Sequence, residues 1–333
     1  MKVVFSTYSR IGLNIGGLQN QISLTRAELI KKGIEVTLHD QWKDLDCDCD
    51  ILHLFATDSS NNYLAKKAKD RGIKVVISPV LNAFSQSKYL YKMKTYLSKL
   101  PGVYSDIKRT KEVFFISDKI IALNLQEKEL ISFVFNIPRS KIEVVPNGTE
   151  ARFFQSKGKR KNNVINLLQV GTVEKRKNQL SVVKAINSIS SGETRFNYTI
   201  VGPIKDIKYH RDLLVHAKDN VVLKGPIPYS SKELLNEYKK ADAFILPSFS
   251  EVMPLVLYEA AASNCKLIVS KSFPIQSEIK SNSFLINPNN EKSITNALLK
   301  LEKGEEKKDF DTSFILTWEA VSDRIASIYD EVK

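Results

Sequence analysis

Residues 241–259 read ADAFILPSFSEVMPLVLYE and pass from an apolar strand through a short turn into a helix. The run Ala243–Leu246 is typical of a buried strand, Pro247–Ser250 of a turn, and the segment from Pro254 of a helix. Short strands of this kind alternate with helical segments along the chain, which predicts parallel α/β sheets. Ligands of such sheets bind at the carboxyl ends of the strands, where this turn lies.

The alternation predicts two sets of strands and helices. In the first half we expect strands at Lys2–Ser6, Glu35–Leu38, Ile51–Phe55, Lys74–Ser78, Lys119–Leu123 and Ile142–Val145, and helices such as Gln19–Lys32 and Asn62–Arg71. In the second half we expect strands at Ile165–Val170, Tyr198–Val201, Val221–Leu223, Ala243–Leu246 and Lys266–Val269, and helices at Asn178–Ser188, Ser231–Lys239 and Pro254–Ser263. The fold class predicted is α/β, with two doubly wound, Rossmann-like domains facing a cleft.

A polar, basic stretch at residues 153–163 interrupts the alternation, and we interpret it as an interdomain linker. It separates an N-terminal domain at residues 1–152 from a C-terminal domain at residues 164–311, followed by residues 312–333. Two domains also agree with the length of 333 residues, at roughly 150 residues per domain.

Composition excludes several classes of protein. With 43% hydrophobic and 26% charged residues, the chain is globular and not disordered. No run approaches the ~18 consecutive apolar residues of a membrane span, and Met1–Ser6 reaches Arg10 too early for the apolar core of a secretory signal. Cys47, Cys49 and Cys265 cannot form a disulfide framework. We therefore expect a cytoplasmic protein.

Basic residues exceed acidic ones throughout the chain, with 50 Lys and Arg against 37 Asp and Glu and a formal net charge of +13. Residues 1–150 hold 22 basic and 16 acidic side chains, and residues 151–333 hold 28 and 21. This balance favours an acidic partner: nucleic acid, anionic lipid or a phosphorylated small molecule. Composition alone leaves these three open.

Two glutamates, Glu251 and Glu259, flank the start of the helix that follows Ala243–Leu246. The first N–H groups of a helix are unpaired, so a strand–loop–helix junction is suited to an anion. We place Glu251 in the loop and Glu259 one and a half turns inside the helix, where a carboxylate could accept two hydrogen bonds from a ribose diol. The alternative is a pair of solvated glutamates, which their spacing does not exclude.

Two glycine-containing loops also follow predicted strands. In residues 170–179, VGTVEKRKNQ, Gly171 permits a tight turn, and Arg176 and Lys177 near a helix start are suited to a diphosphate. The alternative is a solvated basic loop. Gly16 and Gly17 follow Lys2–Ser6 but lack the G-x-G-x-x-G spacing of the dinucleotide fingerprint.

Together these motifs resemble the retaining nucleotide-sugar glycosyltransferases of family four, which have the two-Rossmann-domain GT-B fold. Five segments carry the resemblance in the family's order: Gly16–Gly17, residues 144–149 (VVPNGT), residues 171–178 (GTVEKRKN), residues 241–259 with their E-x7-E pair, and a closing helix with Trp318 and Arg324–Tyr329. The resemblance implies that this helix, within residues 312–333, packs back on the N-terminal domain.

The resemblance implies transfer of a hexose-type sugar from a nucleoside diphosphate sugar, such as a UDP- or GDP-sugar, with retention. The acceptor would be a glycan or a lipid-linked glycan in the synthesis of capsule, exopolysaccharide or lipopolysaccharide. Lys177 and Arg176 would bind the diphosphate, Glu251 would contact the sugar, and these three would be catalytic. Glu259 would hold the ribose. The donor site would also include Gly16, Gly17, Gly171, Ile227, Met253, Leu255 and Val256. The family needs no metal or other cofactor.

Two positions depart from the family pattern. A histidine often follows the fourth strand of the first domain, but Val80 occupies its place here. His53, at the end of Ile51–Phe55, either shares the cleft or is structural. Pro254 offers no N–H to the sugar. A second hypothesis is therefore a catalytically weak or inactive nucleotide-sugar-binding partner of another glycosyltransferase. Nucleic-acid binding rests on charge alone, without a recognised motif, so we expect none.

Residues 44–50, DLDCDCD, contain the D-x-D metal signature of other glycosyltransferases twice. They lead into a predicted strand at its amino end, the wrong edge for a ligand, so we interpret them as a polar turn and expect no metal.

Residues 88–111 carry seven basic residues and one acidic residue, interleaved with Tyr89, Tyr91, Tyr96 and Tyr104. Cations with aromatic side chains are typical of segments that lie at a membrane surface. This segment either docks the protein on the inner face of the plasma membrane, near a lipid-linked acceptor, or forms a solvated basic helix whose tyrosines pack on the domain.

Overall fold

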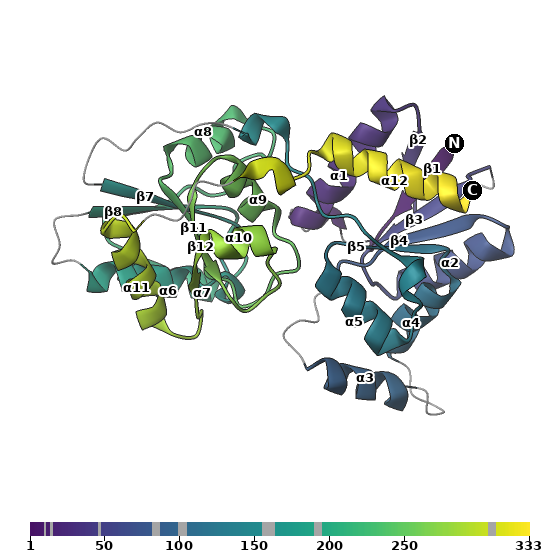
Figure 1. The fold of residues 1–333 in the computed structure, drawn as a ribbon, viewed down its shortest axis with the longest axis horizontal. Coiled ribbons are helices and arrows are strands. Elements are labelled where there is room, and N and C mark those ends of the chain that lie inside the picture. Colours follow the sequence, from purple (N-terminus) through teal and green to yellow (C-terminus); the bar gives the residue numbers. More distant parts are fainter. Residues whose placement is uncertain are drawn as a thin grey trace. The chain divides into compact units, whose positions relative to one another are not determined.

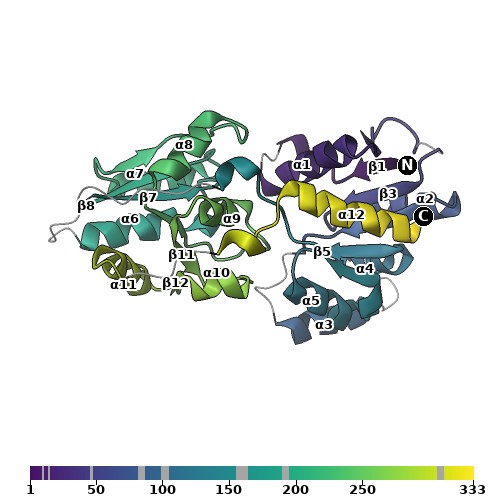
Figure 2. The same ribbon diagram turned by 45° about the horizontal axis from the view of Figure 1, so that its top comes forward.

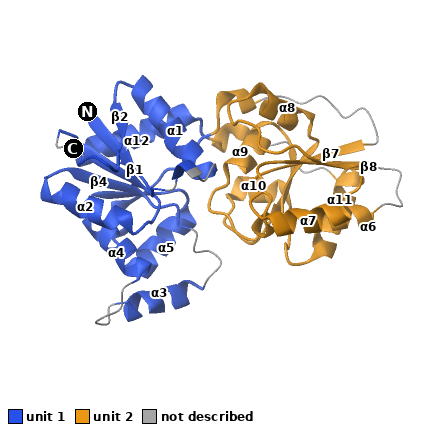
Figure 3. Ribbon diagram, turned by 180° about the vertical axis from the view of Figure 1, so that it is seen from behind, with its two compact units in different colours: residues 1–148, 316–333 blue, residues 149–315 orange. Residues whose placement is uncertain are grey.

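The computed structural model describes residues 1–9, 11–13, 16–45, 48–81, 87–98, 105–154, 164–189, 195–305 and 311–333. The chain divides into two compact units, residues 1–148 with 316–333 (unit 1) and residues 149–315 (unit 2) (Figure 3). Each unit contains a six-stranded sheet in which every neighbouring pair of strands is parallel. The α/β fold class predicted from the alternation of strands and helices is confirmed.

The sheet of unit 1 has the strand order β2-β1-β3-β4-β5-β6 (Figure 1). Its strands are β1 (Lys2–Ser6), β2 (Glu35–Leu38), β3 (Ile51–Phe55), β4 (Lys74–Ser78), β5 (Lys119–Ala122) and β6 (Ile142–Val144). Its helices are α1 (Gly17–Lys31), α2 (Ser60–Asp70), α3 (Lys88–Leu97), α4 (Asp106–Ile116), α5 (Leu125–Phe135) and α12 (Trp318–Val332), with 3₁₀ turns at Ile11–Leu13 and Arg139–Lys141. The direction of winding reverses between β1 and β3, which is where such sheets bind ligands.

The sheet of unit 2 has the order β12-β11-β10-β7-β8-β9. Its strands are β7 (Val164–Val170), β8 (Arg195–Val201), β9 (Val221–Leu223), β10 (Ala243–Leu246), β11 (Lys266–Ser270) and β12 (Ser283–Ile286). Its helices are α6 (Gln179–Ser188), α7 (Ile207–His216), α8 (Lys232–Lys240), α9 (Leu255–Ala262), α10 (Ser277–Ser281) and α11 (Glu291–Glu302), with 3₁₀ turns at Ala151–Phe153, Lys175–Lys177 and Thr312–Phe314. β12 is absent from the sequence prediction. All four residues of β10 are buried, as expected for a central parallel strand.

The boundary between the units differs from the predicted one by a few residues, because unit 2 begins at Thr149. Phe153 is fully buried, its ring centroid 5.3 Å from that of Tyr238, and its carbonyl oxygen accepts a hydrogen bond from the Ser263 hydroxyl. The predicted linker therefore begins with a core residue of unit 2. Its remaining part, residues 155–163, lies outside the described residues.

Helix α12 belongs to unit 1, where it packs alongside α1 (Figure 2). The chain crosses α12 closely at Gly148, where a Cβ atom would lie 2.7 Å from backbone atoms of Trp318. In the described ranges, none of the helices has both the length and the apolar character needed to cross a lipid bilayer.

A buried histidine joins α12 to the sheet of unit 1. His53 is 0% exposed, and its Nδ1 lies 2.6 Å from the Tyr329 hydroxyl while its Nε2 lies 2.9 Å from the Ser78 hydroxyl. Burial lowers the pKa of His53 to about 3, so the ring is neutral. Of the two interpretations of His53, the structural one is correct.

Removing the Tyr329 hydroxyl should destabilise unit 1. Tyr329→Phe leaves His53 Nδ1 buried without a partner, so we expect the free energy of unfolding to fall by about 1–3 kcal/mol in urea denaturation. Ser327→Ala, an exposed site on the same helix, is the control and should change it by less than about 0.5 kcal/mol. Equal stabilities of the two variants would contradict this role of His53.

Candidate functional site

Three loops meet at the carboxyl edge of the sheet in unit 2. The Phe249 N–H, after β10, donates to the Arg176 carbonyl oxygen at 3.0 Å. Asn178 has a left-handed backbone, with φ 58°, and its side-chain amide donates to the carbonyl oxygens of Pro247 and Pro288 at 3.3 and 3.0 Å. The loops after β7, β10 and β12 are thus held together by hydrogen bonds to backbone.

The first turn after β7 depends on close backbone contact. A Cβ atom on Gly202 would lie 2.1 Å from the Gly171 carbonyl oxygen, so only glycine allows the loops after β7 and β8 to approach this closely. Below the turn, buried Gln169 donates to the Lys177 carbonyl oxygen at 2.9 Å and accepts from the Tyr198 hydroxyl. The sheet interior therefore fixes the backbone of Lys177.

Charged side chains from these loops form one cluster. Lys177 Nζ donates to Glu251 Oε1 at 2.6 Å, and Arg176 donates to the same oxygen at 3.0 Å and to the Ser250 carbonyl oxygen at 2.8 Å. The other guanidinium nitrogen of Arg176 donates to Glu174 Oε1 at 2.8 Å, and Lys205 Nζ lies 3.5 Å from Glu174 Oε2. The side chains of Lys177 and Glu251 are only 10% and 11% exposed.

The cluster holds more positive than negative charge. Three cations, Arg176, Lys177 and Lys205, face the carboxylates of Glu174 and Glu251. Burial opposes ionisation of Glu174, but the Thr172 hydroxyl and the neighbouring cations together hold its pKa below the ordinary value. Glu174 therefore remains charged near neutral pH. Chemically, the cluster can exchange a carboxylate for a phosphate oxygen on Lys177 and Arg176.

Glu259 lies inside unit 2, on the fifth residue of α9, and is 1% exposed. The Tyr238 hydroxyl donates to its Oε2 at 2.6 Å, while its Oε1 is buried and has no hydrogen-bond partner among the described residues. Burial raises the pKa of Glu259 to about 7, although the hydroxyls of Tyr238 and Tyr229 favour the charged form. The alternative of a solvated glutamate is wrong for Glu259 and for Glu251.

The other candidate donor residues divide between the units. Gly171, Ile227, Met253, Leu255 and Val256 all belong to unit 2. Met253 and Leu255 are buried, whereas Val256 and Ile227 are half-buried. Gly16 caps the start of α1 with extended backbone, and Gly17 is the first residue of that helix, both in unit 1. α9 begins at Leu255, and Pro254 precedes it as the cap. Sequence reasoning assigned no role to Glu174 or Lys205, although Glu174 stands in the G-T-x-E motif.

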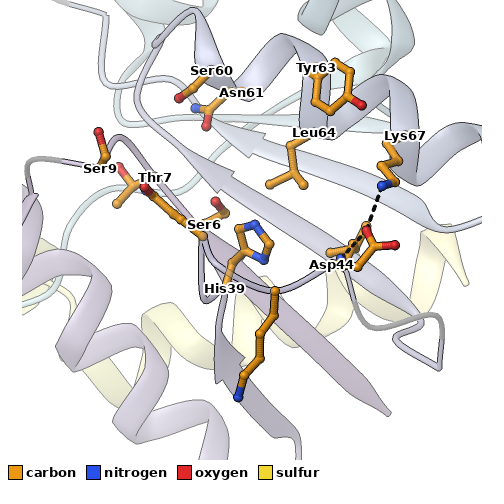
Figure 4. Close-up of a pocket in the computed structure, with 13 residues that line it drawn as sticks. Ser6, Thr7, Ser9, His39, Asp44, Ser60, Asn61, Tyr63, Leu64 and Lys67 are labelled. Carbon is orange, nitrogen blue, oxygen red and sulfur yellow. Dashed lines mark hydrogen bonds and ion pairs between the residues drawn. The ribbon is translucent and has the colours of Figure 1, made fainter.

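Unit 1 holds a hollow of about 430 Å³ at the carboxyl ends of β1 and β2 (Figure 4). Hydroxyl, amide and imidazole groups line much of it: those of Ser6, Thr7, Ser9, His39, Gln41, Ser60 and Asn61. Burial lowers the pKa of His39, so its imidazole is neutral at pH 7. Such a lining suits a ligand rich in hydroxyl groups.

The acidic run at residues 44–50 borders this hollow at Asp44. Asp44 lies 2.8 Å from Lys67 Nζ and 2.6 Å from Arg71, so this carboxylate is paired with cations. Asp46 and Cys47 lie outside the described residues. Within the described part of the chain, no three His, Cys, Asp or Glu side chains gather to hold a metal ion.

Two α/β units, each with a six-stranded parallel sheet, are the architecture of the GT-B fold of glycosyltransferases. The chain has a TM-score of 0.76 with sucrose-phosphate synthase from Thermosynechococcus elongatus at 14% identity, covering 99% of both chains. It has a TM-score of 0.71 with Anabaena Alr3699/HepE in complex with UDP-glucose at 12% identity, covering 99% of this chain and 100% of that one. At these identities the likeness establishes the fold alone.

Residues 150–311 match the family "Glycosyl transferases group 1", so the chain carries a domain of this family. Over 200 residues it is 28% identical to the Escherichia coli UDP-Gal:alpha-D-GlcNAc-diphosphoundecaprenol alpha-1,3-galactosyltransferase, covering 55% of this chain and 51% of that protein. Over 201 residues it is 29% identical to the O-antigen chain mannosyltransferase RfbU of Salmonella typhimurium, covering 59% and 52%. The chain spans about half the length of these relatives.

The buried carboxyl of Glu259 predicts a dependence of stability on pH. Its pKa is about 7 in the folded unit against 4.5 in the unfolded chain, so the folded state alone holds this proton between those pH values. This contribution to stability is therefore lost as pH rises through 7. Glu259→Gln stays neutral, so its stability relative to the wild type should rise between pH 5 and pH 8, measured by denaturant titration.

Comparing variant with wild type removes the effect of Glu127 in unit 1, whose pKa burial also raises to about 7. A stability difference that stays constant across this pH range would show that Glu259 ionises normally in the folded unit.

Proposed function

We propose that the chain is a glycosyltransferase that moves a sugar, with retention, from a nucleoside diphosphate sugar to a glycan or lipid-linked acceptor in cell-surface polysaccharide synthesis. The observation that carries this proposal is the cluster at the carboxyl edge of β7, in which Arg176, Lys177 and Lys205 outnumber the two carboxylates that they face. The group 1 family match supports it, as do two relatives that are named galactosyltransferase and mannosyltransferase.

The chemistry of the proposed reaction needs positive charge that is already in place. When the sugar leaves, negative charge grows on the departing diphosphate, and cations fixed in advance stabilise that transition state without reorganisation. Lys177 suits this role because its backbone is held by Gln169 and its ammonium is largely shielded from water. In this proposal the diphosphate replaces Glu251 on Lys177 and Arg176, which frees Glu251 to contact the donor sugar.

The donor's nucleoside would extend toward α9 in this proposal. Glu259 Oε1 is a buried acceptor without a partner, as a ribose-binding carboxylate requires, and reaching it demands that a ligand displace the side chains that cover it. We propose a UDP- or GDP-sugar as donor. A UDP-sugar is supported by the UDP-glucose complex of the Anabaena neighbour and by the UDP-Gal in the name of the E. coli relative.

We further propose that the hydroxyl-lined hollow of unit 1 receives a sugar unit of the acceptor, and that the protein works in the cytoplasm at the inner face of the plasma membrane. The name of the E. coli relative contains a diphosphoundecaprenol acceptor, which is a membrane lipid.

The second candidate is a nucleotide-sugar-binding partner without its own turnover. Two observations favour it: Pro254 removes a backbone donor beside Glu251, and Val80, in place of the family histidine, has a left-handed backbone with φ 47° that strains a β-branched residue. Donor turnover by the purified chain separates the two candidates.

Lys177 and Glu259 should affect different kinetic constants. Lys177→Ala should lower kcat by about 10²–10³-fold, because its charge matters most as the diphosphate leaves. Glu259→Ala should mainly raise KM for the donor, because a ribose is held equally before and after transfer. Lys175→Ala, an exposed neighbour in the same 3₁₀ turn, is the control. Near-normal transfer by both variants at saturating donor would refute this assignment of the site.

We propose that transfer needs no metal, because Arg176, Lys177 and Lys205 supply positive charge at the site. Excess EDTA should therefore leave the rate within about twofold, whereas loss of a catalytic metal costs several kcal/mol. Loss of transfer in EDTA that manganese restores would contradict this proposal and favour a metal site at the D-x-D motifs of residues 44–50.

A further inference from the structure

Helix α3 presents an unusual surface. It forms an outer layer of unit 1, beyond α4 and α5 and away from the sheet (Figures 1 and 3). Five of its ten residues are large hydrophobic side chains that are 50–66% exposed: Tyr89, Leu90, Met93, Tyr96 and Leu97. We call these five residues the outer stripe. Water-exposed apolar clusters of this size on one short helix mark interaction sites.

Most of the outer stripe faces away from the domain, but the Tyr89 ring at its edge packs edge-on against Phe133 of α5, with the ring centroids 5.5 Å apart. At 3.6 residues per turn its members span an arc of roughly 120°. The opposite side of α3 packs on unit 1: the Tyr91 ring lies 5.7 Å from that of Phe135, Thr95 is buried, and Lys92 Nζ lies 4.1 Å from the centre of the Phe133 ring. The tyrosines therefore divide, with Tyr91 packed on the domain and Tyr89 and Tyr96 largely exposed, while Tyr104 lies outside the described residues.

Lysines border the outer stripe on both sides. With the same helical geometry, Lys94 lies beside Leu90 at one edge. Lys88 and Lys92 lie beyond Tyr96 at the other edge, where their Nζ atoms are 5.4 and 4.1 Å from the centre of the Phe133 ring. Helix α3 contains no acidic residue. An apolar stripe flanked by lysines, with tyrosines near its edge, matches a bilayer surface in which acyl chains lie below anionic headgroups.

We infer that α3 lies in the plane of an anionic membrane surface, with the outer stripe inserted among the lipids and Lys88 and Lys94 on the headgroups. This inference assigns a surface to the membrane association proposed above. It rests on the proposed function only for the purpose of that association, which is to bring the enzyme to a lipid-linked acceptor.

A second copy of the chain fits this surface poorly. Pairing two outer stripes would bring two lysine borders together in a protein whose net charge is already +13. A ten-residue helix is also about 15 Å long and about 10 Å wide, so its face is far smaller than the ~800 Å² per partner of a stable protein interface.

The experiment is sedimentation of the full chain with vesicles of phosphatidylcholine, with and without phosphatidylglycerol, at low and physiological salt and without donor. We expect binding to anionic vesicles that weakens with salt, because screening acts on the lysines. Lys88→Glu with Lys94→Glu should weaken it by more than about tenfold. Lys232→Glu with Lys239→Glu, the same charge change on exposed positions of α8, should have a much smaller effect.

The apolar part is tested by Leu90→Glu with Met93→Glu, which should abolish vesicle binding. Leu214→Glu with Val215→Glu, two exposed apolar residues of α7, is the matched control and should retain it. Circular dichroism verifies that each variant is folded. No binding of the wild type to anionic vesicles, or equal binding of all variants, would overturn the inference.

Analytical ultracentrifugation tests whether a second copy of the chain, rather than a membrane, covers the outer stripe. Dimerisation that the Leu90→Glu, Met93→Glu variant abolishes would assign the outer stripe to a second copy and overturn the inference. Because vesicle binding is measured without donor, it does not depend on sugar transfer. Failure of transfer by a protein that still binds vesicles would therefore count against the proposed function alone.

Discussion

The ion pair between Lys177 and Glu251, 2.6 Å long, is the interaction on which the site in unit 2 depends. It joins residues from the loops after β7 and β10, and both side chains are largely withheld from water. A buried cation is costly without an opposite charge beside it, so Glu251 compensates Lys177 and holds its ammonium in place. In our proposal, Glu251 occupies the cations that the donor diphosphate would bind.

That constraint explains the supporting residues. Gly171 and Gly202 allow the loops after β7 and β8 to touch, Asn178 fastens three loops with its side-chain amide, and Gln169 holds the Lys177 carbonyl from below. The carboxylate of Glu174 pairs with Arg176 and so offsets the repulsion between the adjacent cations of Arg176 and Lys177. Each of these residues acts on the position of a charge, which is the property that electrostatic stabilisation of a leaving diphosphate requires.

Much of the fold and part of the site could be predicted from sequence because the signals are local. Apolar runs such as Ala243–Leu246 mark strands, and the motifs around Lys177 and Glu251 are contiguous. The partners of these residues were not predictable, since Lys177 meets Glu251 across 74 positions and Glu259 accepts a hydrogen bond from Tyr238, 21 positions away on another helix. His53 was ambiguous for the same reason: its partner Tyr329 lies 276 positions away. The start of unit 2 was predicted too late in the chain. The polar, basic residues after Phe153 indicated a linker, and a single apolar residue beside them gave no signal that it belongs to a core.

The central claim is that the Arg176–Lys177 cluster binds a diphosphate in exchange for Glu251. Calorimetric titration of UDP and GDP into the wild type, Lys177→Ala and Glu251→Gln tests it most directly. The account predicts that at least one nucleotide binds the wild type, that Lys177→Ala weakens this binding by about tenfold or more, and that Glu251→Gln binds at least as tightly because the competing carboxylate is neutral. Unchanged affinity in Lys177→Ala, or a loss in Glu251→Gln as large as that in Lys177→Ala, would contradict it.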